Sequence, residues 1–243
     1  MSVNPRYSRL IVVLLGVVLY PQAKYARRII PLLPDAAKPW QGSVPGRDPV
    51  SILVLGDSTA AGVGAGTQED ALPGNLARRL SDEWDRGATW RAVGENGATS
   101  ADIVRRYLDE ASEQQYDFIF VSIGANDALK LRSRAAFRRS FRTILRRLRR
   151  VSPKALILVS SLPGFSQFTA LPNPLRWALG LHARSLEAVA RRFAASEPGV
   201  IMSPPAPEYT HGFFATDRFH PSPKGYREWV DFALTDAKLV RSS

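Results

Sequence analysis

Residues 50–58 read VSILVLGDS, a short apolar run (residues 50–55) followed directly by Gly56, Asp57 and Ser58. A continuous apolar run of this length, bounded by turn residues, is typical of a strand that is buried on both faces. A second run, DFIFVSI at residues 117–123, is followed by Gly124-Ala125-Asn126-Asp127. Both stretches therefore predict a buried strand with small and polar residues at its carboxyl end.

Helical patterns alternate with these apolar runs. The clearest spans residues 134–151, where apolar side chains follow the 3.6-residue period at Phe137, Phe141, Ile144, Leu145 and Leu148. Further helices are predicted at about residues 71–84, 101–111, 175–195 and 223–233, and further strands at residues 90–93, 155–160 and 200–202. Strands alternating with helices imply βαβ units. We predict one α/β domain over residues 50–243, a three-layer α/β/α fold with a central parallel sheet.

The composition excludes several classes of protein. Of the 243 residues, 45% are hydrophobic and 23% are charged, as in an ordinary globular protein, which excludes a mostly disordered chain, collagen, a coiled coil and a polytopic membrane protein. The chain has no cysteine, so it has no disulfide, no thiolate nucleophile and no cysteine-based metal site. Its net charge of +11 is compatible with nucleic acid, an anionic membrane surface or an acidic substrate as partner.

The N-terminal residues have a different character. Residues 10–20 (LIVVLLGVVLY) carry no charge, but a helix of this length spans only roughly 16 Å of a bilayer core about 30 Å thick. Basic residues precede this run at Arg6 and Arg9 and follow it at Lys24, Arg27 and Arg28. We predict that residues 1–30 are a membrane-associating segment, with membrane contact through residues 10–30. The alternatives are a signal that is cleaved on export and a helix docked on the domain.

Residues 31–49 hold five prolines and two glycines, and we predict that they form a linker.

Ser58 stands where an α/β sheet binds its ligands, just beyond the carboxyl end of a strand. In that place its hydroxyl would face the crevice, and its backbone N–H would be free to donate. The alternative is that Gly56-Asp57-Ser58 forms only a turn or a cap. The sequence contains no G-x-G-x-x-G, no G-x-x-x-x-G-K-[ST] and no G-x-S-x-G, so it lacks the fingerprints of nucleotide binding and of the α/β-hydrolase elbow.

Two other places carry residues suited to catalysis. The neutral amide of Asn126 can donate to a developing oxyanion, unless it serves only in a turn or a helix cap. Asp217 precedes His220 by three residues, so it can accept from imidazole Nδ1–H and leave Nε2 as a base. Metal binding is the alternative for this pair, but no H-E-x-x-H accompanies it. Of the other histidines, His211 is the second candidate base, and His182 is expected to be a packing or surface residue.

Taken together and in this order, the motifs resemble those of the SGNH hydrolases, the GDSL-type esterase superfamily. The resemblance covers about residues 50–235 and rests on Gly56-Asp57-Ser58, Asn96-Gly97-Ala98-Thr99, Gly124-Ala125-Asn126-Asp127 and Asp217-x-x-His220. In the second motif, Asn96 stands where a serine is usual. The resemblance implies a flavodoxin-like α/β/α fold and hydrolysis of esters without a metal or an organic cofactor.

The resemblance also assigns roles to residues. It implies that Ser58 is the nucleophile, that His220 is the general base and that Asp217 orients His220. It implies an oxyanion hole made of the backbone N–H of Ser58, the backbone N–H of Gly97 and the side chain of Asn126. The expected protein is a serine esterase that acts on a small-molecule or lipid ester. Within the superfamily, residues 162–184 are similar to the corresponding stretch of bacterial lipase-like members.

Other functions remain as alternatives. A carbohydrate O-acetyl esterase or an acyltransferase can use the same residues, and a non-catalytic binding protein is the third possibility. We expect no nucleic-acid partner, because Phe137 and Phe141 lie on the apolar stripe of their helix and are not available to stack on bases. The arginines of residues 134–150 face either anionic lipid or solvent. Five large side chains after the fourth strand line an acyl site, cover it, or pack on the core: Phe165, Phe168, Leu171, Leu175 and Trp177.

Overall fold

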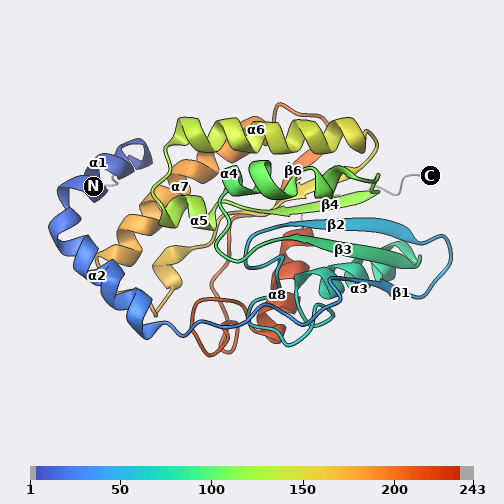
Figure 1. The fold of residues 1–243 in the computed structure, drawn as a ribbon, viewed down its shortest axis with the longest axis horizontal. Coiled ribbons are helices and arrows are strands. Elements are labelled where there is room, and N and C mark those ends of the chain that lie inside the picture. Colours follow the sequence, from blue (N-terminus) through green and yellow to red (C-terminus); the bar gives the residue numbers. More distant parts are fainter. Residues whose placement is uncertain (1–3, 236–243) are drawn as a thin grey trace.

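The computed structural model describes residues 4–235, which fold around one six-stranded sheet (Figure 1). The strands are β1 (Gln41–Val44), β2 (Val50–Gly56), β3 (Ala88–Gly94), β4 (Phe118–Ser122), β5 (Leu156–Val159) and β6 (Val200–Met202). The α-helices are α1 (Ser8–Leu14), α2 (Gly16–Ile29), α3 (Leu72–Trp84), α4 (Ser100–Asp102), α5 (Ala125–Leu129), α6 (Arg134–Val151), α7 (Leu175–Ala194) and α8 (Pro223–Leu234). Single turns of 3₁₀ helix are formed by η1 (Pro5–Tyr7), η3 (Glu110–Ser112) and η4 (Phe165–Gln167), and a π-helical turn by η2 (Ile103–Tyr107).

The sheet has the order β1-β3-β2-β4-β5-β6, in which only the pairing of β1 with β3 is antiparallel. The five parallel strands follow the flavodoxin-like order, in which β2, the first of the five along the chain, lies between β3 and β4. This confirms the predicted α/β/α fold with a central, mostly parallel sheet. In such a sheet the direction of winding changes beside the first parallel strand, which places the ligand crevice at the carboxyl ends of β2 and β4.

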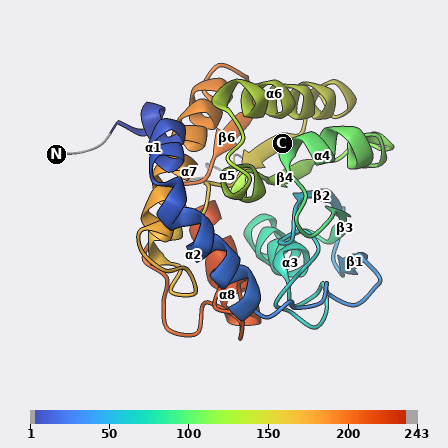
Figure 2. The same cartoon turned by 60° about the vertical axis from the view of Figure 1, so that its left-hand side comes forward.

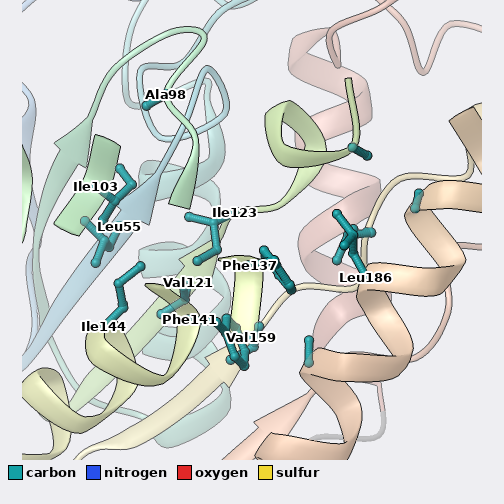
Figure 3. Close-up of a cluster of buried hydrophobic side chains, with 14 of the residues drawn as sticks. Leu55, Ala98, Ile103, Val121, Ile123, Phe137, Phe141, Ile144, Val159 and Leu186 are labelled. Atoms are coloured by element: carbon teal, nitrogen blue, oxygen red, sulfur yellow. The ribbon is translucent and has the colours of Figure 1, made fainter. Parts of the chain in front are cut away.

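Alternate side chains of the strands enter two separate cores. On β2, Leu53 and Leu55 pack with α6 and α7, whereas Ile52 and Val54 pack with α3 and α8 on the opposite face. The helices accordingly lie on both sides of the sheet (Figure 1). A close-up of the first core shows side chains of three neighbouring strands beside those of α6, among them Leu55, Val121 and Val159 with Phe137, Phe141 and Ile144 (Figure 3). Because both faces are covered, the strands read as continuous apolar runs.

The prediction for α6 is confirmed at both ends, and all five residues of its apolar stripe are buried. The helix predicted at residues 101–111 is instead divided into α4, η2 and η3, which include a π-helical turn. The range 31–49, predicted as a linker, contains β1, whose polar residues fit the exposed edge of a sheet and therefore lack an apolar pattern. Before β1, Ala36 N–H donates to Ala61 O and Ala37 N–H donates to Gly66 O, so residues 36–44 are held to the domain.

The N-terminal helices α1 and α2 lie against α7 (Figure 2). A buried hydrogen bond of 2.9 Å joins Ser8 Oγ to His182 Nδ1. Further along, the side-chain amide of Gln22 donates to Asn173 O and accepts from Leu175 N–H at the start of α7. Within residues 4–235, no single helix has both the length and the apolar character to cross a membrane; α1 and α2 meet that requirement only as a pair bent by 88°.

Candidate active site

Three loops that carry the predicted site residues leave the same edge of the sheet. Ser58 follows β2, Gly97 follows β3, and Asn126 follows β4 at the first turn of α5. The strand ends approach closely, since a Cβ on Gly94 would lie 2.0 Å from the carbonyl oxygen of Gly56. Glycine at the end of β3 therefore lets the loops after β2 and β3 start side by side.

The loop after Ser58 is joined to the segment that carries His220. Gly64 has a φ of +96°, and a Cβ there would lie 2.2 Å from the carbonyl oxygen of Pro221, so only glycine fits this approach. In addition, Tyr226 Oη of α8 donates a 2.7 Å hydrogen bond to Val63 O. These contacts bring two segments that are more than 150 residues apart to one end of the sheet.

Asp57 is buried and accepts three hydrogen bonds. Its Oδ1 atom accepts from the backbone and hydroxyl of Thr59, and its Oδ2 atom accepts from Asn126 Nδ2 at 3.2 Å. Burial raises the pKa of Asp57 to about 6, against the opposing effects of the Thr59 hydrogen bonds and of nearby His220. Asp57 thus connects the residue next to Ser58 with the side chain of Asn126. From the sequence, Asp57 is interpreted only as a turn residue, because its partner Asn126 lies 69 residues away.

Asp127 connects the loops after β3 and β4. It is fully buried, and its two oxygens accept hydrogen bonds of 2.8 and 2.7 Å from the backbone and hydroxyl of Ser100. Arg132 Nε lies 4.0 Å away. Burial raises the pKa of this carboxyl, while the Ser100 hydrogen bonds act to lower it. On the same loop, Lys130 Nζ donates to Gly97 O at 3.0 Å, so the Gly97 and Asn126 segments are held together by two contacts. Nothing near Asp127 in the sequence indicates this role, because its partner Ser100 lies 27 residues away.

Asp217 and His220 form the pair that their spacing predicts. Asp217 Oδ2 lies 2.6 Å from His220 Nδ1, and Asp217 Oδ1 accepts from the backbone N–H groups of Phe219 and His220. Burial acts to raise the pKa of Asp217, but the hydrogen bonds from His220 and Phe219 outweigh it and leave the pKa below its usual value. Because Asp217 is therefore a carboxylate, Nδ1 carries the proton of the shared bond and Nε2 is left as the basic atom.

Ser58 and His220 line the same cavity, which has a volume of about 450 Å³. Its wall is largely apolar and aromatic, with rings contributed by Phe165, Phe168, Tyr209, Phe213, Phe214, Phe219 and Trp229. Phe168 lies near the middle of this aromatic group, with its ring centroid 5.1 Å from that of Phe219 and 5.0 Å from that of Phe214. The serine hydroxyl and the imidazole are therefore next to a concave apolar surface, the arrangement typical of a small-molecule site.

Two backbone donors also lie in these loops. Among the residues that the structure describes, the backbone N–H groups of Ser58 and Gly97 donate to no protein acceptor. Backbone N–H groups without a protein acceptor can donate to a negatively charged oxygen. Within residues 4–235, no three histidine, aspartate or glutamate side chains are placed to hold a metal ion.

The other candidate residues have different surroundings. His182 is fully buried, as a packing residue, and its Nε2 atom lies 3.1 Å from Arg132 O. His211 is exposed and is not part of the cavity wall. Of the large side chains after the fourth predicted strand, Phe165 and Phe168 line the cavity. Leu171 and Leu175 are buried in the core next to α6 and α7.

Comparisons with known proteins agree with this arrangement. The model of the GDSL-like lipase/acylhydrolase family matches residues 54–228. A GDSL-like esterase of Mycobacterium tuberculosis is 28% identical in an alignment that covers 90% of this chain and 76% of that protein.

Solved structures show the same fold. A lipase from a goat rumen metagenome superposes with a TM-score of 0.61 at 16% identity, over 75% of this chain and 94% of that one. A family 3 carbohydrate esterase from Clostridium thermocellum gives 0.57 at 17% identity, over 77% and 94% of the two chains. These two likenesses show the fold alone. The family match covers most of the domain, and the chain therefore belongs to the GDSL-like lipase/acylhydrolase family, as a hydrolase of ester bonds.

Proposed function

We propose that the protein is a serine esterase in which Ser58 attacks the ester carbonyl, His220 is the general base and Asp217 orients His220. One observation carries the proposal: Ser58 and His220 line a single cavity, while a carboxylate holds Nδ1 of that histidine at 2.6 Å. With Nδ1 held by the carboxylate, Nε2 is the imidazole atom available as a base in the cavity that Ser58 also lines, which supports activation of the serine.

The reaction proceeds through an acyl-enzyme. His220 Nε2 takes the Ser58 proton as Oγ bonds to the ester carbon, which forms a tetrahedral intermediate with a negatively charged oxygen. When this intermediate collapses, the bond to the leaving alcohol breaks and His220 gives the proton to the alcohol oxygen. Water then attacks the acyl-enzyme with His220 again as base, and the carboxylic acid is released with Ser58 restored.

The negatively charged oxygen is bound by three donors in this proposal: the backbone N–H groups of Ser58 and Gly97 and the side-chain amide of Asn126. The hydrogen bonds of Asp57 and Asp127 support this assignment, because they connect the three loops that carry the donors. Preorganised donors stabilise the transition state without a cost of reorientation during the reaction.

The cavity wall favours an ester with an apolar acyl group. An aromatic wall gains from contact with hydrocarbon, whereas a sugar ring needs many convergent polar groups. The lipase from the goat rumen metagenome and the carbohydrate esterase from Clostridium thermocellum share the fold, so the fold alone does not select between their substrates. We therefore infer a carboxylic ester with an aliphatic or lipid-like acyl chain as the substrate class.

Labelling with a fluorophosphonate, followed by peptide mapping, tests the nucleophile. We expect the adduct on Ser58, and we expect Ser58→Ala to lose both labelling and hydrolysis of p-nitrophenyl esters while its circular dichroism is unchanged. Ser161→Ala is the matched control, because Ser161 lines the same cavity and its variant should label normally. An adduct on another residue, or turnover by Ser58→Ala above a blank preparation, would exclude Ser58 as the nucleophile.

A series of esters with increasing acyl length tests the substrate class. An apolar cavity predicts that kcat/KM rises from acetyl to longer acyl groups. Highest activity on acetylated xylan, with no gain from chain length, would instead assign a carbohydrate deacetylase. Transfer of the acyl group to an added alcohol in preference to water would assign an acyltransferase.

A further inference from the structure

The exposed apolar side chains of the molecule gather at its N-terminus. In the part of the chain that the structure describes, ten of the eleven exposed large hydrophobic residues lie between Tyr7 and Leu32, and the other is Trp177 on α7. We call these eleven residues the N-terminal apolar surface. Leu14 and Val17 are 81% and 89% exposed. Exposed apolar side chains gathered in one region of a protein usually mark an interaction site.

The same two helices also have an inner face that is fixed to the domain. Leu19 and Ala26 are buried in the core next to α6 and α7, and Val12, Leu15, Ala23 and Ile30 are partly buried against it. The hydrogen bonds of Ser8 and Gln22 attach the helices at two further points. The outer face therefore belongs to an element that is docked on the domain. It carries large apolar side chains at positions where a helix between core and water would be polar.

The charges around this surface identify its partner. Residues 1–34 contain five arginines and lysines and no aspartate or glutamate. At the start of α6, Arg134 lies close enough to Arg6 and to Arg192 of α7 for the positive charges to disfavour one another. Repulsion among cations is relieved by a surface of negative charge. In addition, Tyr20, Tyr25 and Trp177 are exposed, and such aromatic side chains prefer the boundary between hydrocarbon and water.

We propose that the N-terminal apolar surface docks on an anionic lipid bilayer, with α1 and α2 lying in its interfacial layer. The bend of 88° between the helices and their packing on α7 fit an element that lies along a bilayer surface. Apolar side chains enter the acyl boundary, and the flanking arginines and lysines meet the lipid phosphates. This proposal is independent of the catalytic assignment.

Docking would also bring the catalytic end of the domain near the lipid. The chain that leaves α2 passes the loop before Asp217, where Leu33 and Pro34 share a surface hollow with Phe214 and Ala215. Phe214 in turn lines the cavity of Ser58 and His220. Phe214 thus borders both the hollow beside residues 33–34 and the cavity, which places the end of α2 near the catalytic end of the domain.

Co-sedimentation of the full chain with vesicles tests the proposal. We expect binding to phosphatidylglycerol vesicles that exceeds binding to phosphatidylcholine vesicles and weakens as salt is added. Leu14→Asp/Val17→Asp should lower binding to phosphatidylglycerol at least about tenfold, because two exposed apolar side chains are replaced by anions. The control, Gln114→Asp/Gln115→Asp, adds the same charge at exposed positions in the loop before β4 and should bind like the unchanged protein.

Hydrolysis of a water-soluble ester is measured in parallel, and both double variants should retain it, which shows that they are folded. Three outcomes would overturn the proposal. The first is equal loss of vesicle binding in both double variants, or loss in neither. The second is binding to the two lipids that is equal and insensitive to salt. The third is a dimer in sedimentation velocity that Leu14→Asp/Val17→Asp dissociates without vesicles, since a second copy would then cover the surface.

Discussion

The side-chain amide of Asn126 donates a 3.2 Å hydrogen bond to Asp57 Oδ2, which joins the residue before Ser58 to the first turn of α5. Asp57 is almost fully buried and Asn126 is half-buried, so this bond is partly shielded from water and holds the amide more firmly than a fully exposed contact would. The position of Asn126 relative to Ser58 therefore depends on the carboxyl group of Asp57, which is not one of the three residues of the proposed triad.

A double-mutant cycle measures this dependence. Asn126→Ala should lower kcat by about 10²–10³-fold with little change in KM, because an oxyanion donor acts mainly in the transition state. Asp57→Asn should lower kcat by a smaller factor, and it should have little further effect in the Asn126→Ala background. Steady-state kinetics of the four proteins provide the test. Independent, additive losses would show that Asp57 does not act through Asn126.

The ionisation of Asp57 predicts a pH dependence of stability. Because burial raises its pKa from 3.8 to about 6, the folded protein binds a proton more tightly than the unfolded chain. The free energy of unfolding should therefore fall as pH rises from about 4 to about 6, by at most about 3 kcal/mol. Asp57→Asn should lack this decrease. Urea unfolding of both proteins from pH 4 to pH 8 checks it, and a difference in stability that is constant with pH would contradict it.

Asp217→Asn should separate the orientation of the His220 imidazole from the folding of the loop that carries it. The asparagine oxygen can still accept from the N–H groups of Phe219 and His220, but its amide cannot accept from Nδ1–H, so the imidazole loses its required tautomer. We expect kcat to fall by about 10²-fold or more. The exposed residue Asp82 provides the control variant Asp82→Asn, which should keep full activity. Equal activity of the two variants would remove Asp217 from the mechanism.

Asp217 also has a pH window of its own. Its pKa is lowered on folding, so its contribution to stability is present above the unfolded value of 3.8 and is lost as pH falls below it. Asp217→Asn should therefore be more destabilising at pH 7 than near pH 3. This result would be the opposite of the one expected for Asp57→Asn, which distinguishes the two carboxyls.

The buried contact between Ser8 and His182 predicts an effect on stability without an effect on catalysis. Ser8→Ala should lower the free energy of unfolding by about 1 kcal/mol and leave kcat unchanged.

Burial lowers the pKa of His182 from 6.5, so the unfolded chain binds a proton that the folded protein does not. Stability should fall as pH drops below 6.5, and His182→Gln should remove that dependence. Thermal unfolding at pH 7.5 and pH 5.5 is the measurement. An identical pH dependence in the unchanged protein and in His182→Gln would contradict this prediction.

The sequence by itself determined the elements whose signals are local. The helix at residues 134–151 was predicted at both ends because its apolar side chains repeat every turn, and a helix is formed by contacts within that distance. The Asp217–His220 pair was predicted for the same reason, since three residues in one turn bring a carboxylate and an imidazole together without help from the rest of the fold. Strand β2 was evident because a strand covered on both faces is apolar throughout.

Only the tertiary structure decided the contacts between distant residues. Asp57 meets Asn126 across 69 residues, Asp127 meets Ser100 across 27, and Ser8 meets His182 across 174. Nothing in the local sequence distinguishes these side chains from ordinary turn or surface residues. Strand β1 was missed for a related reason. An edge strand is held in place by backbone hydrogen bonds to its neighbour, here β3, and needs no apolar pattern. A single side chain acquires such a partner only when strands and helices pack, because packing sets which loops start side by side.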